Sequence, residues 1–398
     1  MAIDYAGPRS ARTRARRMEA GAEAFARNFD WILFGGVAAL VGYGLHLVAG
    51  ITRDDVAGSP DYYVVRQAIY AAVGGVAMLG VSLLDPDIFR RYWRQLYAVS
   101  LLLLLLVIPL GTEARGSQRW LGVGPLTFQP SELGKLLVVL AVAGFLAERA
   151  RRVGEVGTVL GAIGLTVIPT VLVFMQPDIG TSLVYGAALA AMLFVAGTRW
   201  LHVVALVTTI AVAAGLVVWL LPSLGIDVLE PYQRDRLTAF VDRESDPQGA
   251  SYNVQQSILA VGAGGLRGRG VDNSTQTNLD YLPEHATDFA FASLAEQRGF
   301  VGAAILLCLY LLVVWRGLRV ITVARDMYSA VVAGGIVFAF LFQVFVNVGM
   351  TMGIAPITGI PLPFVSVGGS SMIANLAAMG VLLAIHARGR GSRVSRRR

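Results

Sequence analysis

The chain contains, at residues 101–110, the stretch LLLLLLVIPL and, at residues 159–174, the stretch VLGAIGLTVIPTVLVF. Neither stretch carries a charged side chain, so neither has the polar face that a surface helix of a soluble protein needs. About twenty consecutive apolar residues cross a bilayer as a helix. The composition agrees, because 15% of the 398 residues are charged, against about 25% in a soluble domain. We therefore predict an all-α polytopic membrane protein.

Ten apolar windows extend this pattern along the chain. The predicted transmembrane helices cover residues 31–50, 64–84, 95–110, 132–147, 157–175, 179–196, 201–221, 289–314, 328–350 and 367–386. Only the short polar break Gln176-Pro177-Asp178 separates the fifth window from the sixth, so the boundary between these helices is left open. We predict one membrane domain over residues 31–386, with a basic segment at residues 1–30 and a basic tail at residues 387–398.

The placement of arginine predicts how these helices are oriented. Arginines cluster before the first window, after the last, and in the short loops that follow the second, fourth and eighth windows. Each cluster follows an even number of spans, so all lie on the side of both termini, which the positive-inside rule makes cytoplasmic. This placement accounts for the net charge of +7, and nucleic acid is not an expected partner. Residues 1–30 fit either a basic helix on anionic membrane lipids or a disordered tail, and not a cleavable signal peptide.

With this topology, residues 222–288 form one large extracytoplasmic loop between the seventh and eighth helices. The loop contains a helix-like stretch at residues 252–261, followed by a glycine-rich turn at residues 262–270. The spacing of the turn matches neither the P-loop nor the dinucleotide-binding fingerprint, which favours a loop or a helix C-cap over a phosphate cradle. Arginines earlier in the loop, among them Arg236, either bind a pyrophosphate group or are merely solvated.

Asp288 ends this loop directly before an apolar window. Thr287 or Asp288 stands where an N-cap is expected, and as an N-cap Asp288 would have a structural role, satisfying backbone amides of the helix that follows. As a carboxylate at the membrane boundary beside a long polar loop, it could act as a general base on a lipid-linked substrate. The two roles are compatible, because a cap fixes the position of the side chain. Asp288 is the candidate catalytic residue.

Further polar residues lie at the predicted outer ends of other helices. Arg119 and Trp120 precede a helix start at Pro130, after which Glu132 and Lys135 stand three residues apart on one helix face. A helix-stabilising ion pair is one interpretation, although a charge placed in a membrane span usually faces a cavity. Lys135 is the only lysine in the chain, which indicates a need for a compact ammonium group. Trp120 fits either sugar stacking or the aromatic belt of the membrane interface.

Two other segments on this side complete the pattern. Asp178 follows Pro177 where a helix cap is expected. Residues 352–371 contain several prolines and glycines, which predict an irregular loop rather than a continuous helix. Such a loop is tolerated at membrane depth only where it is buried in protein or lines a cavity. Together the clusters predict a single cavity at the outer leaflet.

Several runs of the sequence closely resemble the SEDS family of shape, elongation, division and sporulation proteins, with the RodA branch favoured over the FtsW branch. The runs are residues 116–121, 128–136, 176–181, 246–270, 282–289 and 347–371. The resemblance extends over about residues 30–386. It implies a peptidoglycan glycosyltransferase of the bacterial cytoplasmic membrane that polymerises lipid II on the extracytoplasmic face for cell-wall elongation and cell shape. It also implies a class B penicillin-binding protein as partner and undecaprenyl pyrophosphate as the leaving group.

The resemblance also implies roles for individual residues. Asp288 corresponds to the essential aspartate of the family. Trp120, Glu132, Lys135 and Asp178 correspond to other functionally sensitive polar positions of the family. The predicted substrate-binding residues are these four together with Arg119, Arg236, Gln256 and Ser370. No dedicated metal motif is visible, so the expected divalent cation, Mg²⁺ or Mn²⁺, would be held by Asp288 together with the substrate pyrophosphate.

This sequence departs from the family pattern at three positions near the predicted site. Ala286 stands where a histidine is common, and His285 is displaced by one position. Val367 replaces a tyrosine, and Gln297 replaces an acid. Two alternative functions stay open from the sequence: a transporter that flips lipid II, and a noncatalytic scaffold for a penicillin-binding protein.

Overall fold

The computed structural model describes residues 26–114, 117–123, 126–225, 233–236, 240 and 249–396. Each predicted window corresponds to one apolar helix. These helices are α2 (Trp31–Ile51), α3 (Tyr62–Leu83), α5 (Trp93–Leu110), α6 (Pro130–Glu148), α7 (Val156–Phe174), α8 (Ile179–Val195), α9 (Trp200–Gly215), α14 (Ala290–Val323), α15 (Met327–Thr351) and α16 (Gly369–Arg396). Within the described residues, eight are long and apolar enough to cross a membrane, and α8 and α9 are shorter. The helical polytopic architecture is confirmed, whereas the count of ten spans stays a prediction.

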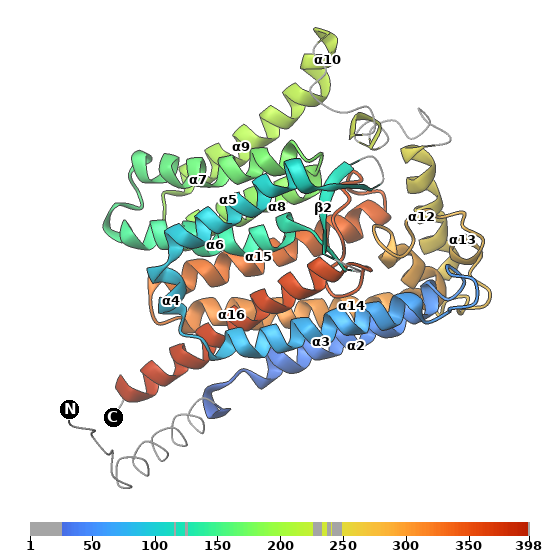
Figure 1. Ribbon diagram of the computed structural model, residues 1–398, viewed down its shortest axis with the longest axis horizontal. Coiled ribbons are helices and arrows are strands. Elements are labelled where there is room, and N and C mark those ends of the chain that lie inside the picture. The colour runs from blue at the N-terminus through green and yellow to red at the C-terminus, as the bar shows by residue number, and fades with distance from the viewer. Residues whose placement is uncertain are drawn as a thin grey trace, which may run out of the picture.

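Short helices lie at the two ends of this bundle. They are α4 (Pro86–Arg91), η1 (Ala150–Arg152), the π-helical η2 (Leu216–Leu220), α10 (Leu221–Ser223), α12 (Ala250–Gly264) and α13 (Thr275–Asn278). Figure 1 shows α4 and the end of α16 at one end of the bundle, and α12 and α13 at the opposite end. Helix α12 confirms the predicted helical stretch of the long loop. Helix α16 continues past residue 386 into the predicted basic tail, and most of the predicted N-terminal segment, residues 1–25, lies outside the described residues.

The all-α prediction agrees with the fold class but did not include a small sheet between α5 and α6. A small antiparallel sheet of order β1-β2-β3 is formed there by β1 (Thr112–Ala114), β2 (Ser117–Val123) and β3 (Leu126–Phe128). Thr112 pairs with Trp120, and Leu121 pairs with Phe128. Two residues separate β1 from β2 in the sequence, and two separate β2 from β3. The sheet matters for function because β2 carries Arg119 and Trp120.

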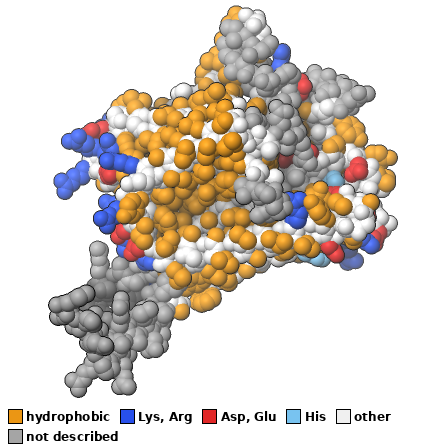
Figure 2. Space-filling view, in the orientation of Figure 1, with side chains coloured by type: hydrophobic (Ala, Val, Ile, Leu, Met, Phe, Trp, Pro, Cys, Tyr) orange, Lys and Arg blue, Asp and Glu red, His pale blue; other side chains and the backbone are white. Residues whose placement is uncertain are grey.

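Apolar side chains occur both inside the bundle and on its surface. Helix α6 buries every residue from Leu136 to Leu146, as expected for a helix that is hydrophobic on all sides. Helix α9, in contrast, buries none of its residues. Hydrophobic side chains also cover the middle of the face that Figure 2 shows, whereas basic side chains, which are arginines there, gather at the end of the bundle where α4 lies. This distribution is the one that a bilayer requires of a membrane-spanning bundle.

The glycine-rich turn after α12 forms hydrogen bonds to α14 at a point where α14 is not helical. At Gly299 the backbone of α14 is not helical, with φ 65° and ψ −165°. The turn lies against this break: the amide of Phe300 donates to the carbonyl of Gly265 at 2.9 Å, and the amide of Arg269 donates to the carbonyl of Glu296 at 2.8 Å. Gly265 is also the C-cap of α12. The interpretation as a helix C-cap is therefore confirmed.

Replacing Gly299 by alanine is expected to destabilise the protein by about 3 kcal/mol, because this region of φ and ψ is almost restricted to glycine. A Cβ atom there would also clash with the amide nitrogen of Gly268. Thermal unfolding in detergent should show a melting temperature lower by roughly 5 °C. Gly164 of α7 is the matched control, since a Cβ atom there meets nothing within 4 Å. Equal melting temperatures for the two variants would contradict this account of the break.

Candidate active site

A cavity of about 240 Å³ lies among β2, the start of α6, the segment before α14, the loop between α15 and α16, and the start of α16. Five of the nine predicted site residues line it: Arg119, Trp120, Glu132, Arg236 and Asp288. Segments far apart in the sequence thus bring two acidic residues, two arginines and a tryptophan to one cavity. The prediction that the polar clusters share one cavity is confirmed for these five residues.

The backbone that carries Asp288 is held at four consecutive carbonyl groups, those of residues 285–288. The donors, in chain order of the acceptors, are Ser293 Oγ at 3.2 Å, the Val367 amide at 2.9 Å, Ser366 Oγ, and Asn347 Nδ2 at 3.0 Å. These donors come from α14, α15 and the loop between α15 and α16. Because a buried carbonyl group is costly to leave without a partner, this segment has little freedom to move.

The predicted role of Thr287 or Asp288 as an N-cap is wrong. Helix α14 begins at Ala290, and the residue at its cap position is Phe289, whose side chain makes no capping hydrogen bond. The amide of Phe289 instead donates to the carbonyl of Glu284 at 3.1 Å, which closes a turn before the helix. The hydroxyl of Thr287 donates to the carboxylate of Glu284 at 2.6 Å. The Asp288 carboxylate thus lines the cavity, with its Oδ2 3.9 Å from Nη2 of Arg236.

Lys135 lies behind Glu132 rather than on the cavity wall. Its ammonium group donates to both carboxylate oxygens of Glu132 at 2.9 Å and to Oε1 of Gln343 at 3.2 Å. The exposed fractions of the side chains are 11% for Lys135 and 2% for Glu132. The predicted contact between these residues is confirmed. A charge pair so deeply buried is retained only where its hydrogen bonds are complete, so the two side chains act as one unit.

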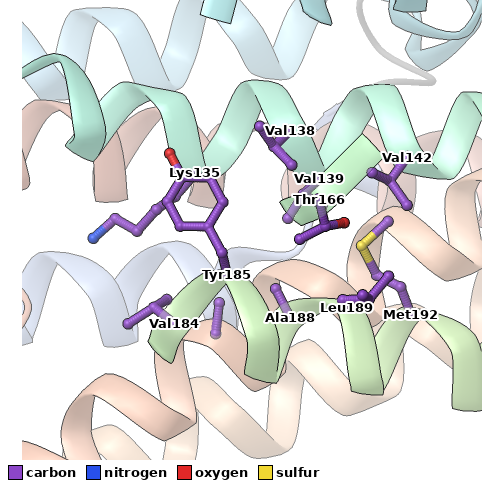
Figure 3. Close-up of a pocket in the computed structure, with 11 residues that line it drawn as sticks. Lys135, Val138, Val139, Val142, Thr166, Val184, Tyr185, Ala188, Leu189 and Met192 are labelled. Atoms are coloured by element: carbon purple, nitrogen blue, oxygen red, sulfur yellow. The ribbon is translucent and has the colours of Figure 1, made fainter. Parts of the chain in front are cut away.

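The floor below this ion pair is apolar and tightly packed. Figure 3 shows Lys135 at one end of a narrow pocket between α6 and α8, with its ammonium group directed away from Val142 and Met192. The volume of this pocket is about 10 Å³, which leaves room for no more than about one water molecule. The polar cavity therefore reaches Glu132, and the small apolar pocket beside Lys135 does not extend it toward Val142 and Met192.

Asp178 does not line the cavity but contacts residues that do. Its Oδ1 accepts a hydrogen bond from the amide of Thr181 at 3.0 Å, so the predicted cap is confirmed at the start of α8. Its Oδ2 accepts a hydrogen bond from the side chain of Gln129 at 3.1 Å, and Nη1 of Arg119 lies 3.9 Å from its Oδ1. Ser370 is also not among the residues that line the cavity. Its hydroxyl oxygen accepts a hydrogen bond from the backbone amide of Gln129 at 2.9 Å.

Two residues that line the cavity were not among the predicted site residues, and one predicted site residue does not line it. Gln129 and Glu284 both line the cavity. Each lies in a run that resembles the SEDS family, and Gln129 directly precedes the helix start at Pro130, which was the available signal. Gln256 lies on α12 and is not among the described residues that line the cavity. Its substrate-binding role stays a prediction.

The described residues do not form a metal site from protein ligands alone. They contain no group of three or more His, Cys, Asp or Glu side chains that could hold a metal ion. Asp288 and Glu284 do present carboxylates to the cavity. Such a site fits a hard cation only when substrate oxygens supply the remaining ligands, as is common for Mg²⁺ at phosphates.

The fold and the cavity define a polytopic membrane protein with a charged site at one end of its helical bundle. Residues 30–391 match the cell cycle protein family of FtsW, RodA and SpoVE, and the chain belongs to this family. The predicted membership of the SEDS family is thus confirmed.

Relatives and solved structures agree with this assignment. The peptidoglycan glycosyltransferase MrdB of Escherichia coli K12, a RodA protein, is 41% identical over 315 residues, which cover 79% of this chain and 83% of MrdB. The probable peptidoglycan glycosyltransferase FtsW of Idiomarina loihiensis is 36% identical over 364 residues, which cover 90% and 87%. The higher identity with MrdB favours the RodA branch.

Two solved structures are similar over nearly the whole chain. One is a chain of a peptidoglycan synthase complex, studied for its coordination of polymerization and crosslinking, with a TM-score of 0.76, 31% identity and coverage of 91% of this chain and 98% of that chain. The other is the rod shape determining protein RodA of Thermus thermophilus, with a TM-score of 0.67, 28% identity and coverage of 90% and 96%.

Proposed function

We infer that this protein is a peptidoglycan glycosyltransferase that polymerises lipid II into glycan strands. The observation that carries this inference is the Asp288 carboxylate, which lines the cavity on a backbone segment held at four carbonyl groups. Placing a base within reach of the proton that it removes is the first requirement of general base catalysis. The names of the relatives, peptidoglycan glycosyltransferases, point to the same reaction.

The proposed reaction is a single displacement with inversion. Asp288 accepts the proton of the 4-hydroxyl group of N-acetylglucosamine on one lipid II molecule. The oxygen attacks the anomeric carbon of the terminal N-acetylmuramic acid of the growing strand and forms a β-1,4 bond. The bond from that carbon to the pyrophosphate oxygen breaks, and its electron pair leaves with undecaprenyl pyrophosphate. Proton acceptance by a positioned side chain typically contributes about 10² to 10⁴ in rate.

Two arginines of the cavity suit the charge of the leaving group. Arg119 and Arg236 both line the wall, and the planar guanidinium group binds phosphate oxygens through paired hydrogen bonds. Asp178 and Gln129 lie behind Arg119 and would orient it. Trp120 lies on the same strand and lines the cavity, which favours sugar stacking over a place in the aromatic belt.

A divalent cation, Mg²⁺ or Mn²⁺, completes the proposal for the leaving group. Asp288 would hold it together with the substrate pyrophosphate, and when bound it would offset negative charge on the leaving group. Chelation by EDTA is expected to lower polymerisation about tenfold or more, with recovery on adding back Mg²⁺ or Mn²⁺. The melting temperature of the substrate-free protein should not change, because the described residues form no protein-only metal site. Full activity in EDTA would exclude the cation.

The distribution of buried charge favours an enzyme over a lipid II transporter. Among the described residues, Glu132, Asp178 and Glu296 are buried toward the cavity end of the bundle, and Asp30 and Arg316 form an ion pair near the opposite end. The intervening part of α6, residues 136–147, contains no charged side chain. Transporters place their substrate and ion sites near the membrane midplane.

The remaining details extend the same proposal. The ten apolar windows support ten transmembrane helices, and the arginine placement supports cytoplasmic termini and a cavity at the outer leaflet. A class B penicillin-binding protein is the proposed partner, supported by the similarity to a chain of a peptidoglycan synthase complex. Service in cell-wall elongation is favoured by the higher identity with MrdB.

Vesicles that contain the purified protein and fluorescent lipid II test enzyme against transporter. Strand formation is read from gels after extraction, and translocation is read from quenching of the fluorophore by a membrane-impermeant reagent. The expected result is strand formation when the partner is present, with no faster translocation than in protein-free vesicles. Rapid translocation without strands would overturn the proposed function.

A further inference from the structure

A buried contact outside the cavity joins His285 to Asp55. Nε2 of His285 lies 3.0 Å from Oδ1 of Asp55, and both side chains are mostly buried. Asp55 belongs to the connection between α2 and α3, and His285 lies three residues before Asp288. Neither residue is among the described residues that line the cavity. The proposed chemistry therefore makes no direct use of either side chain.

The contact acts on the segment that carries the candidate base. The four carbonyl groups of residues 285–288 accept neutral hydrogen bonds from α14, α15 and the loop between α15 and α16. The contact with Asp55 attaches the same segment to a fourth part of the fold, the connection between α2 and α3. Unlike the four backbone contacts, it joins two ionisable side chains. The side chain of the next residue, Ala286, has no polar group with which to make such a contact. Because the turn from Glu284 to Phe289 is closed by a backbone hydrogen bond of 3.1 Å, a shift at residue 285 is transmitted to residue 288.

We propose that His285 and Asp55 form a positioning pair that holds the Asp288 segment through the connection between α2 and α3. This inference rests on the proposed function. Misplacing a catalytic group by about 1 Å can lower the rate as much as a hundredfold. Loss of the pair is expected to lower kcat for polymerisation about tenfold while KM for lipid II changes less than about twofold, because neither side chain lines the cavity.

The charge state of the pair gives the proposal a signature in pH. Burial lowers the pKa of His285, but the hydrogen bond and charge of Asp55, together with the charge of Asp280, outweigh it and raise the pKa above its usual value. A raised pKa means that the charged pair is fully formed at low pH and weakens as pH rises through that pKa. His285→Gln keeps a neutral donor without the charge. The ratio of wild-type kcat to that of His285→Gln should therefore be largest at acidic pH and decline as pH rises.

The test measures kcat and KM with purified lipid II, from about pH 5.5 to 8.5, for the full-length protein with its penicillin-binding partner. The variants are Asp55→Asn, His285→Ala, His285→Gln and the double variant Asp55→Asn/His285→Ala. Asp55→Asn and His285→Ala should each lose about tenfold in kcat, and His285→Gln should lose less. The kcat of the double variant should be no lower than that of His285→Ala, because the two substitutions remove the same interaction.

A neighbouring ion pair supplies the matched control. Arg53 contacts Asp272 at 2.9 Å and so also joins the connection between α2 and α3 to the long loop, but the side chains are 56% and 82% exposed. Exposed pairs contribute little, so Arg53→Ala should keep wild-type kcat. Melting temperatures separate positioning from folding: Asp55→Asn should lose kcat without a matching loss of stability.

Several outcomes would overturn the inference. They are wild-type kcat for both Asp55→Asn and His285→Ala, a loss confined to KM, fully additive losses in the double variant, and a kcat ratio that does not change with pH. If the wild type is active and the variants are unaffected, only the proposal of a positioning pair is contradicted. If the wild type fails to polymerise lipid II while its partner is folded and bound, both the proposed function and this inference are contradicted.

Discussion

Replacing Asp288 by alanine or asparagine is expected to lower the rate of lipid II polymerisation about a hundredfold or more, the range that a general base contributes. Asparagine keeps the shape of the side chain but cannot accept the proton at neutral pH. The rate is measured as strand formation from purified lipid II in the presence of the partner. The melting temperature should stay close to that of the wild type, because the hydrogen bonds at residues 285–288 involve carbonyl groups of the backbone.

Asp272→Asn is the control for this prediction. Asp272 is an acid of the same long loop, but its side chain is mostly exposed and lies outside the cavity. It should polymerise lipid II at the wild-type rate. A well-folded Asp288→Asn variant that does the same would show that the base lies elsewhere.

Replacing Lys135 by methionine is expected to abolish polymerisation and to destabilise the protein. The change leaves Glu132 buried without its ammonium partner, and breaking a buried ion pair typically costs about 3 to 5 kcal/mol. Glu132 also lines the cavity, so a change in its charge environment alters the site itself. The measurements are thermal unfolding in detergent and polymerisation of lipid II at a temperature where the variant is still folded.

The double variant Glu132→Gln/Lys135→Met separates the two effects. Removing both charges removes the unpaired carboxylate, so most of the lost stability should return. Activity should stay low, because the site then lacks both the carboxylate and the ammonium group behind it. Recovery of polymerisation together with stability would show that the pair serves the fold alone.

The helices of this protein were predictable because a bilayer imposes a length and a composition on each span. The windows at residues 31–50 and 328–350 agree with α2 and α15 to within one residue at each end. The small sheet was not predictable in the same way. Strands β1 and β3 have three residues each, which is too short for an alternating pattern to be recognised. Such strands depend on pairing with a neighbour, and apolarity alone does not specify it.

The chemical types of the site residues were predictable, whereas their partners were not. Asp288, Glu132 and Arg119 stand out in the sequence because charge is costly near a membrane. Their neighbours come from distant segments: Ser366 contacts the carbonyl of Thr287 across 79 positions, and His285 contacts Asp55 across 230. Local sequence carries no signal for such pairs. The mistaken N-cap at Thr287 or Asp288 has the same origin. It was predicted from local sequence, whereas the turn that begins at Glu284 determines the geometry.

The most direct test of the central claim is polymerisation of purified lipid II by the purified full-length protein, bound to its penicillin-binding partner with transpeptidation blocked. Blocking crosslinking leaves uncrosslinked glycan strands as the product, which a gel resolves by length. The account predicts strands with the wild type and almost none with Asp288→Ala at equal protein concentration. Absence of strands from the wild type with a folded, bound partner, or equal strands from both proteins, would contradict it.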